Sequence, residues 1–152
     1  MAESSSPSLL FEVFALGQQV RVLLESAMAD ARLSPQDYAF LSAVFEDESP
    51  TPTQLARRLG APLSTTVEQV QAFERRGLLR RTPNPRDGRS YLVLLSAGGQ
   101  RAHRQANAHF ERAYADVVAR LGRHEGTVTG ALRRLREAVE QAAASEVVGR
   151  RG

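Results

Sequence analysis

Four polar side chains between positions 64 and 71 are spaced to lie on one face of a helix. Ser64, Thr65, Glu68 and Gln71 occupy positions i, i+1, i+4 and i+7, and residues at this spacing share one stripe of a helix surface. In the major groove of DNA, glutamine can pair with adenine through both its amide atoms, and serine or threonine can contact either base type. The stripe therefore has the chemistry of a base-reading surface.

Basic charge is concentrated in the middle of the chain. Residues 1–56 carry two arginines against eight acids, residues 57–89 carry eight against three, and residues 90–152 carry ten against six. This asymmetry, hidden in a net charge of +3, favours a polyanion as the partner of the middle segment. Arg57 and Arg75 are predicted to hold phosphates without reading sequence.

The segment after Gly77 changes from helical to strand-like patterning. Residues 78–82 and 91–95 are short and bulky, and Asp87-Gly88 between them is a hairpin signal. Such a hairpin would carry Arg86 and Arg89 at its tip. Asp87 is expected to stabilise this tip by orienting one of the two arginine side chains, because a carboxylate would be repelled by phosphate.

The elements that must position these residues follow from caps and apolar spacing. Ser34-Pro35 reads as a helix start, Thr53 as the cap of a short helix ending at Gly60, and Ser96 as the cap of a long helix. The predicted fold is mainly α with a small β-hairpin wing, in one domain over 1–152. A winged helix-turn-helix core covers about 34–96, and long amphipathic helices cover about 8–30 and 97–147. Because this core is too small to cover them, these long helices are expected to be dimerisation helices.

Composition excludes several classes of function. The chain has no cysteine and no lysine, so a thiol nucleophile, a Walker A loop and a Schiff base are all excluded. His124-Glu125 begins like a zinc-binding motif, but position 128 is valine. His103 and His109 would lie on different helix faces, and each histidine is expected to face solvent. No enzyme activity, metal or cofactor is predicted.

Location and source are also suggested by the sequence. No stretch approaches the roughly 20 apolar residues that span a membrane, and the first residues lack a signal-peptide pattern. A cytoplasmic protein is expected. The exclusive use of arginine together with abundant alanine indicates a GC-rich bacterial genome.

Residues 51–100 carry four motifs at a familiar spacing and resemble MarR-type transcriptional regulators. The motifs are Leu59-Gly60, Glu74-Arg75-Arg76-Gly77-Leu78, Asn84-Pro85-Arg86-Asp87-Gly88-Arg89 and Ser96-Ala97-Gly98-Gly99. The resemblance implies a homodimer that binds a palindromic operator in double-stranded DNA, commonly as a repressor. It also implies that a small ligand, often phenolic, releases the protein from DNA.

The chain departs from the usual family pattern at Thr66, Val67 and Glu68. The family register would turn Thr66 inward and Val67 towards DNA, where it could touch a thymine methyl; a slightly rotated helix would bury Val67 instead. Glu68 could accept from cytosine N4 or serve as a helix salt-bridge partner. Asn84, in place of the usual aspartate, still suits a turn.

By resemblance, a ligand pocket is expected between the first, second and fifth helices. Its candidate lining residues are Phe14, Tyr38, His109 and Phe110, although aromatic residues at helical spacing also serve as plain core. The alternative function is a winged-helix interaction module, an antagonist of another regulator, that has lost DNA binding. The feature that supports it is Glu68, which stands where the family often has an arginine.

Overall fold

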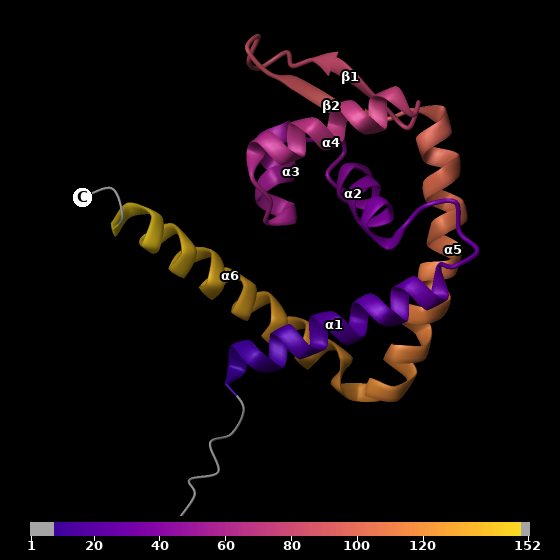
Figure 1. The fold of residues 1–152 in the computed structure, drawn as a ribbon, viewed down its shortest axis with the longest axis vertical. Coiled ribbons are helices and arrows are strands. Elements are labelled where there is room, and N and C mark those ends of the chain that lie inside the picture. Colours follow the sequence, from indigo (N-terminus) through magenta and orange to yellow (C-terminus); the bar gives the residue numbers. More distant parts are fainter. Residues whose placement is uncertain (1–7, 150–152) are drawn as a thin grey trace, which may run out of the picture. The chain divides into compact units, whose positions relative to one another are not determined.

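The computed structural model describes residues 8–149, with side chains as far as residue 145. The elements in chain order are α1 (Leu9–Ala27), α2 (Pro35–Glu46), α3 (Pro52–Leu59), α4 (Leu63–Arg75), β1 (Leu79–Pro83), β2 (Tyr91–Leu95), α5 (Ala97–Leu121), η1 (Gly122–His124) and α6 (Glu125–Gly149) (Figure 1). Contacts divide the chain into two compact units, Met1–Ala113 and Tyr114–Gly152, with the boundary inside α5. The fold is mainly α with a two-stranded wing, as the sequence predicts. The first seven and last three residues of the predicted 1–152 domain lie outside the described residues.

Local capping signals set where the first two helices begin. The Ser8 hydroxyl accepts a hydrogen bond from the backbone N–H of Phe11 (3.2 Å), and Ser34 accepts from Asp37 (3.1 Å). Pro35 fills the first position of α2, where its missing N–H costs nothing. The predicted start of α2 is confirmed.

The cap of α3 is Thr51, so the prediction of Thr53 is wrong. The Thr51 hydroxyl accepts from the Gln54 backbone N–H (3.3 Å), and the Gln54 side chain accepts from the Thr51 backbone N–H (2.8 Å). This reciprocal capping box places Pro52 at the first helical position, so the cap is the residue before the proline. Gly60 ends the helix with a φ of 64°, as predicted, in the left-handed region that glycine adopts without strain.

The wing is an antiparallel hairpin whose base is built into the core. Leu79 pairs with Leu95, Arg81 with Val93 and Pro83 with Tyr91. Along the other edge of β2, the Val93 N–H donates to the Pro50 carbonyl (2.9 Å). Ser96 closes the base because its hydroxyl accepts from the Gly99 N–H (2.9 Å) and donates to the Gly77 carbonyl (2.5 Å). The predicted cap of α5 is therefore confirmed.

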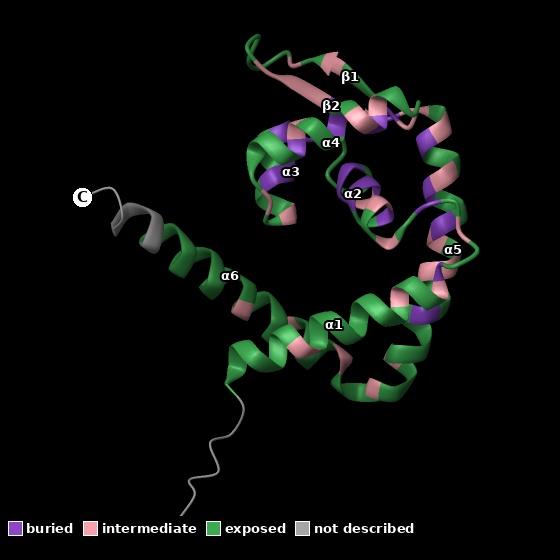
Figure 2. Ribbon diagram, viewed as in Figure 1, coloured by how far each residue is buried: buried purple, intermediate pink, exposed green. Residues whose placement is uncertain are grey.

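The core of the first unit is centred on α2, which is largely buried (Figure 2). The rings of Phe40 and Phe73 stack at 5.0 Å and join α2 to α4. The residues that are fully buried with large side chains are Leu41, Val44, Leu55, Thr66, Val70 and Val93. The helices that carry the polar stripe and the hairpin are thus fixed to one apolar centre.

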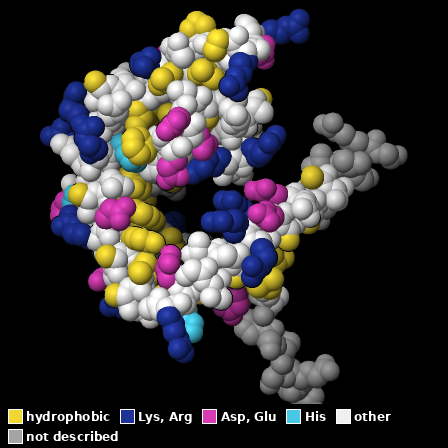
Figure 3. Space-filling view, turned by 180° about the vertical axis from the view of Figure 1, so that it is seen from behind, with side chains coloured by type: hydrophobic (Ala, Val, Ile, Leu, Met, Phe, Trp, Pro, Cys, Tyr) yellow, Lys and Arg dark blue, Asp and Glu magenta, His cyan; other side chains and the backbone are white. Residues whose placement is uncertain are grey.

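The long helix α1 and the second unit contrast with this core. None of the residues of α1 is buried, and Leu9, Leu10, Phe11 and Phe14 are each at least 59% exposed. In α6, Val128, Leu132 and Val139 are exposed, and hydrophobic side chains are visible on the molecular surface in Figure 3. Within the described part of the chain, no helix is both long and apolar enough to cross a membrane.

Candidate nucleic-acid interface

The polar stripe predicted on the fourth helix lies on the exposed face of α4. Ser64, Thr65, Glu68 and Gln71 are all exposed. On the opposite face, Thr66, Val70 and Phe73 are buried. Val67 is half-buried, so the structure has the family register and not the rotated one. Leu63, the apolar residue at the start of this helix, is 48% exposed.

Thr66 occupies a core position without leaving a polar group unsatisfied. Its hydroxyl donates to the Pro62 carbonyl at 3.0 Å, one turn earlier in the chain. A buried hydroxyl that is hydrogen-bonded avoids most of the desolvation cost. This local bond allows a threonine to stand where an apolar side chain would be expected.

The eight arginines of residues 57–89 fall into two groups. Three are held in ion pairs: Arg58 contacts Glu46 and also Asp47 (2.7 Å), Arg76 contacts Asp37 (2.8 Å), and Arg81 contacts Glu74 (2.7 Å). The other five form no ion pair among the described residues, and they are Arg57, Arg75, Arg80, Arg86 and Arg89. An arginine without an acidic partner keeps its positive field for an outside anion, so this second group has the charge for phosphate contacts.

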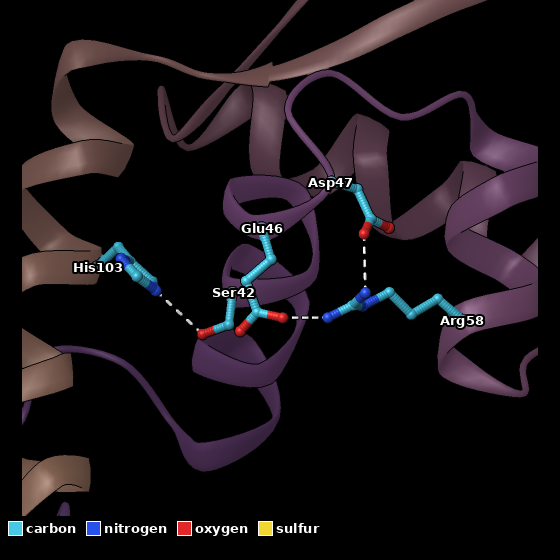
Figure 4. Close-up of polar contacts among 5 residues, drawn as sticks. All are labelled: Ser42, Glu46, Asp47, Arg58 and His103. Carbon is cyan, nitrogen blue, oxygen red and sulfur yellow. Dashed lines mark hydrogen bonds and ion pairs between the residues drawn. The ribbon is translucent and has the colours of Figure 1, made fainter. Parts of the chain in front are cut away.

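Arg58 shows how the paired group is used inside the fold. Figure 4 shows its guanidinium reaching the Glu46 and Asp47 carboxylates at the end of α2, on the side away from His103. The pair joins α3 to α2 and neutralises part of the acidic end of α2. The sequence shows basic residues after position 56 and acidic residues before it, but nothing in it indicates that Arg58 contacts Glu46 and Asp47.

The tip of the wing consists of two consecutive turns instead of a simple Asp-Gly hairpin turn. The Asn84 side chain accepts from the Arg86 backbone N–H, and the Asp87 side chain accepts from the Arg89 backbone N–H, each at 3.0 Å. The Asn84 and Asp87 carbonyls accept from Asp87 and from the Ser90 N–H respectively. The expectation that Asp87 orients an arginine side chain is therefore corrected: it holds the backbone, and the exposed Arg86 and Arg89 side chains project from a braced loop.

A cleft of about 410 Å³ lies between the wing and the α2–α3 connection. Arg86 and Asn84 line the wing side, and Asp47 and Glu48 line the other. The backbone of Glu48 and Ser49 has positive φ values of 47° and 85°, which is uncommon for residues other than glycine. Arg80, which the sequence did not single out, borders a second cavity of about 160 Å³ together with Phe45 and Glu48.

The four predicted ligand-lining residues are not brought together as one set. Tyr38 is buried, its hydroxyl donates to the Asn107 side chain (2.6 Å), and its ring lies 5.2 Å from that of Phe110. Burial raises the pKa of Tyr38, so its hydroxyl stays protonated as a donor. Phe14 is 63% exposed, and His109 contacts Arg112 (3.1 Å). No ring contact joins either of them to Tyr38 within residues 8–145.

His103 is buried, so the expectation that it faces solvent is wrong. Its ring stacks on Tyr38 at 5.3 Å and on Phe45 at 4.9 Å, and its Nε2 lies 3.0 Å from the Ser42 hydroxyl (Figure 4). Burial lowers the pKa of His103, an effect that Glu46 partly opposes and Arg104 reinforces. Its position between buried Gly99 and Ala106 on one face of α5 was the signal that could have revealed it.

Two short helices, the exposed face of the second and a braced basic hairpin define a winged helix-turn-helix protein. A sequence model described as the MarR family matches residues 32–90, while no curated protein matches the chain. The PcaV transcriptional regulator from Streptomyces coelicolor, solved with its natural ligand, is 29% identical. The match has a TM-score of 0.74 and covers 91% of this chain and 99% of PcaV.

Two further solved structures share the fold at lower identity. The M. tuberculosis transcriptional regulator MOSR, solved with DNA, is 21% identical with a TM-score of 0.75, over 89% of this chain and 98% of its own. NadR in complex with 4-hydroxyphenylacetate is 16% identical with a TM-score of 0.78, and the match covers 90% of this chain and 97% of NadR. Over residues 32–90 the chain is similar to the MarR family, and its winged-helix fold is the one that these transcriptional regulators share.

Proposed function

We propose that this protein is a bacterial, cytoplasmic repressor that binds a palindromic operator as a homodimer and is released by a small aromatic effector. The observation that carries the proposal is the exposed polar face of α4 beside arginines that have no acidic partner in the described chain. A helix of this kind fits the major groove, which is about 12 Å wide, and a wing reaches the adjacent backbone.

Within this proposal the DNA-facing residues divide by role. Ser64, Thr65 and Gln71 read base edges, Val67 lies beside them for apolar contact, and Glu68 accepts from a cytosine amino group. Arg57, Arg75, Arg86 and Arg89 contact phosphates. Asp87 keeps the tip arginines in place through its bond to the Arg89 backbone.

The effector is proposed to be a small phenol or aromatic acid. The support is the aromatic cluster of Tyr38, His103 and Phe110, which lies between α2 and α5 and contains a hydroxyl and an imidazole. NadR, which shares the fold, was solved with 4-hydroxyphenylacetate. That compound is a suitable probe, and we expect it to release the protein from its operator and to raise the melting temperature.

The DNA-binding part is tested by a mobility-shift titration on the promoter region upstream of the gene, at several salt concentrations. Arg86→Ala should lower affinity and reduce the slope of log K against log salt by about 0.9 for each subunit of the dimer, because each subunit loses one phosphate contact. Arg133→Ala, which removes the same charge from an exposed position on α6, is the matched control. Failure of the unmodified protein to shift this DNA at low salt would favour an interaction module instead.

A further inference from the structure

We propose that an ion pair between Arg81 and Glu74 clamps the wing to α4, the helix proposed to read DNA. Arg81 would then act as a positioning residue and not as a phosphate contact. The inference rests on the proposed DNA-binding function. Arg81 lies on β1 and Glu74 in the last turn of α4. The two side chains meet through Nη2–Oε2 at 2.7 Å and Nε–Oε1 at 3.1 Å.

The guanidinium of Arg81 makes contacts through its edge, with Glu74, and through one face, with Tyr91. Two of its nitrogens are bound to the two carboxylate oxygens of Glu74, in the paired geometry that gives the most specific arginine contacts. Its face lies over the Tyr91 ring, with 5.2 Å to the ring centroid, and the hydrogen bond to Glu74 raises its pKa further. Two of its three nitrogens and one of its faces are therefore engaged, and its charge is balanced by Glu74.

The clamp lies where it can set the direction of the wing. The chain leaves α4 through Gly77, whose φ of 70° makes a sharp turn, and the hairpin base is held by buried Leu79 and Val93. Arg81 lies two residues beyond Leu79, and Tyr91 is the β2 partner of Pro83, the last paired position before the tip loop. The clamp therefore joins α4, β1 and β2 between the fixed base and the arginine-bearing tip.

Glu74 is otherwise an unfavourable choice at its position. A carboxylate in the last turn of a helix opposes the helix dipole, and one near DNA repels phosphate. The ion pair with Arg81 explains why a glutamate stands at this position. It also gives one variant, Glu74→Gln, whose effect on DNA binding has opposite signs under the two explanations.

Glu74→Gln adds one positive charge to the DNA-binding unit. Simple electrostatics predicts tighter binding, whereas loss of the clamp predicts operator binding weaker by about 3–10-fold, because the wing arginines are no longer held in position. Arg81→Gln should weaken binding to a similar extent while leaving the salt slope unchanged. The double variant should bind no worse than either single variant, because both remove one interaction.

The wing itself can be observed without DNA. The chain contains no cysteine, so a spin label on Gly88→Cys, where an added Cβ meets nothing within 4 Å, reports wing motion at one site. Arg81→Gln and Glu74→Gln should each increase the mobility of the label to a similar degree. Arg81→Lys, which keeps the charge but loses the fork, should also increase it.

Arg76→Gln is the matched control for the label experiment. The side chain of Arg76 is about as exposed as that of Arg81. It forms an ion pair with Asp37 at 2.8 Å and lies 5.0 Å from the centre of the Phe73 ring. These partners lie on α2 and α4 and not on the wing. Its removal should leave the label spectrum unchanged. Because exposed ion pairs contribute little to stability, all these variants should remain folded by circular dichroism.

The outcomes separate this inference from the proposed function. Three results would overturn the clamp: tighter operator binding by Glu74→Gln, a salt slope reduced by about 0.9 per subunit for Arg81→Gln, or an unchanged label spectrum in both variants. If the parent protein binds no duplex, the proposed function fails, and the label spectra still decide whether Arg81 and Glu74 hold the wing.

Discussion

His103 illustrates how one buried polar residue can join the DNA-binding core to a long helix. It lies on α5, stacks between Tyr38 and Phe45 of α2, and shares a hydrogen bond with Ser42 of the same helix. A neutral ring satisfies this arrangement, while an imidazolium would have to be desolvated among aromatic side chains. The contact between α2 and α5 should therefore depend on the protonation state of His103.

The sign of the resulting pH dependence follows from the direction of the shift. Burial lowers the pKa of His103 below its ordinary value of 6.5, so the unfolded chain binds the proton first as the pH falls. The free energy of unfolding should then decrease as the pH drops below about 6.5. His103→Gln should lack this part of the decrease. Urea unfolding of both proteins between pH 5 and 8 provides the measurement, and parallel curves would contradict it.

Gln71 and Arg57 should differ in what their loss does to sequence preference. Gln71→Ala should flatten the preference at one symmetric pair of operator positions, with about 1–3 kcal/mol of discrimination lost. Arg57→Ala should weaken binding to all sequences alike. Selection of preferred sites from a random DNA pool compares the two variants. Enrichment of the parental motif with unchanged stringency by Gln71→Ala would show that α4 presents a different reading face.

At the scale of elements, the start of α5 is held against the chain that leaves α4. An added Cβ at Gly98 would lie 2.9 Å from the Gly77 carbonyl, and one at Gly99 would collide with the Leu78 backbone. Both neighbours are main-chain atoms that cannot rotate away. The two glycines therefore allow the capped end of α5 to approach the base of the wing.

Gly99→Ala should accordingly destabilise the protein even though alanine favours helices. The collision with Leu78 is expected to cost about 1–3 kcal/mol. Gly126→Ala is the control, since it lies in α6 with nothing within 4 Å of an added Cβ, and it should be neutral or stabilising by up to about 1 kcal/mol. Thermal unfolding of the two variants tests this. Equal melting temperatures would mean that the backbone at the base of the wing can shift to accommodate the added methyl group.

The element boundaries could be predicted because their signals are local. Ser34-Pro35 and Gly60 act within one turn of chain, and Ser96 caps α5 as expected. The choice of Thr53 over Thr51 missed a local signal, because Thr51-Pro52-Thr53-Gln54 has the capping-box spacing and a proline at the first helical position. The pairing of Arg58 with Glu46 could not be predicted, since it depends on how α3 packs beside α2. The candidate site could therefore be predicted from the sequence, but not which of its arginines form ion pairs within the fold.

At the scale of the whole molecule, α1 is a helix without a buried residue. Its 19 residues include Phe11 at 59% exposure and Phe14 at 63%. Most helical stability in proteins comes from packing an apolar face of the helix against the rest of the protein. Soluble monomers also rarely expose large contiguous apolar patches. A second copy of the chain is the proposed cover for α1 and for the apolar positions of α6.

The parent protein should therefore scatter light with a mass near twice its chain mass of 16.6 kDa at micromolar concentration. Phe11→Glu combined with Phe14→Glu places two charges on the apolar face and should shift the mass towards one chain. Gln18→Glu adds a charge to an exposed polar position of the same helix and should leave the mass unchanged. Because a dimer presents two recognition helices to two half-sites, the monomeric variant should also lose most of its affinity for a palindromic operator. A parent mass near 16.6 kDa would refute the dimer, and an undiminished dimer in the double variant would show that α1 is not part of its interface.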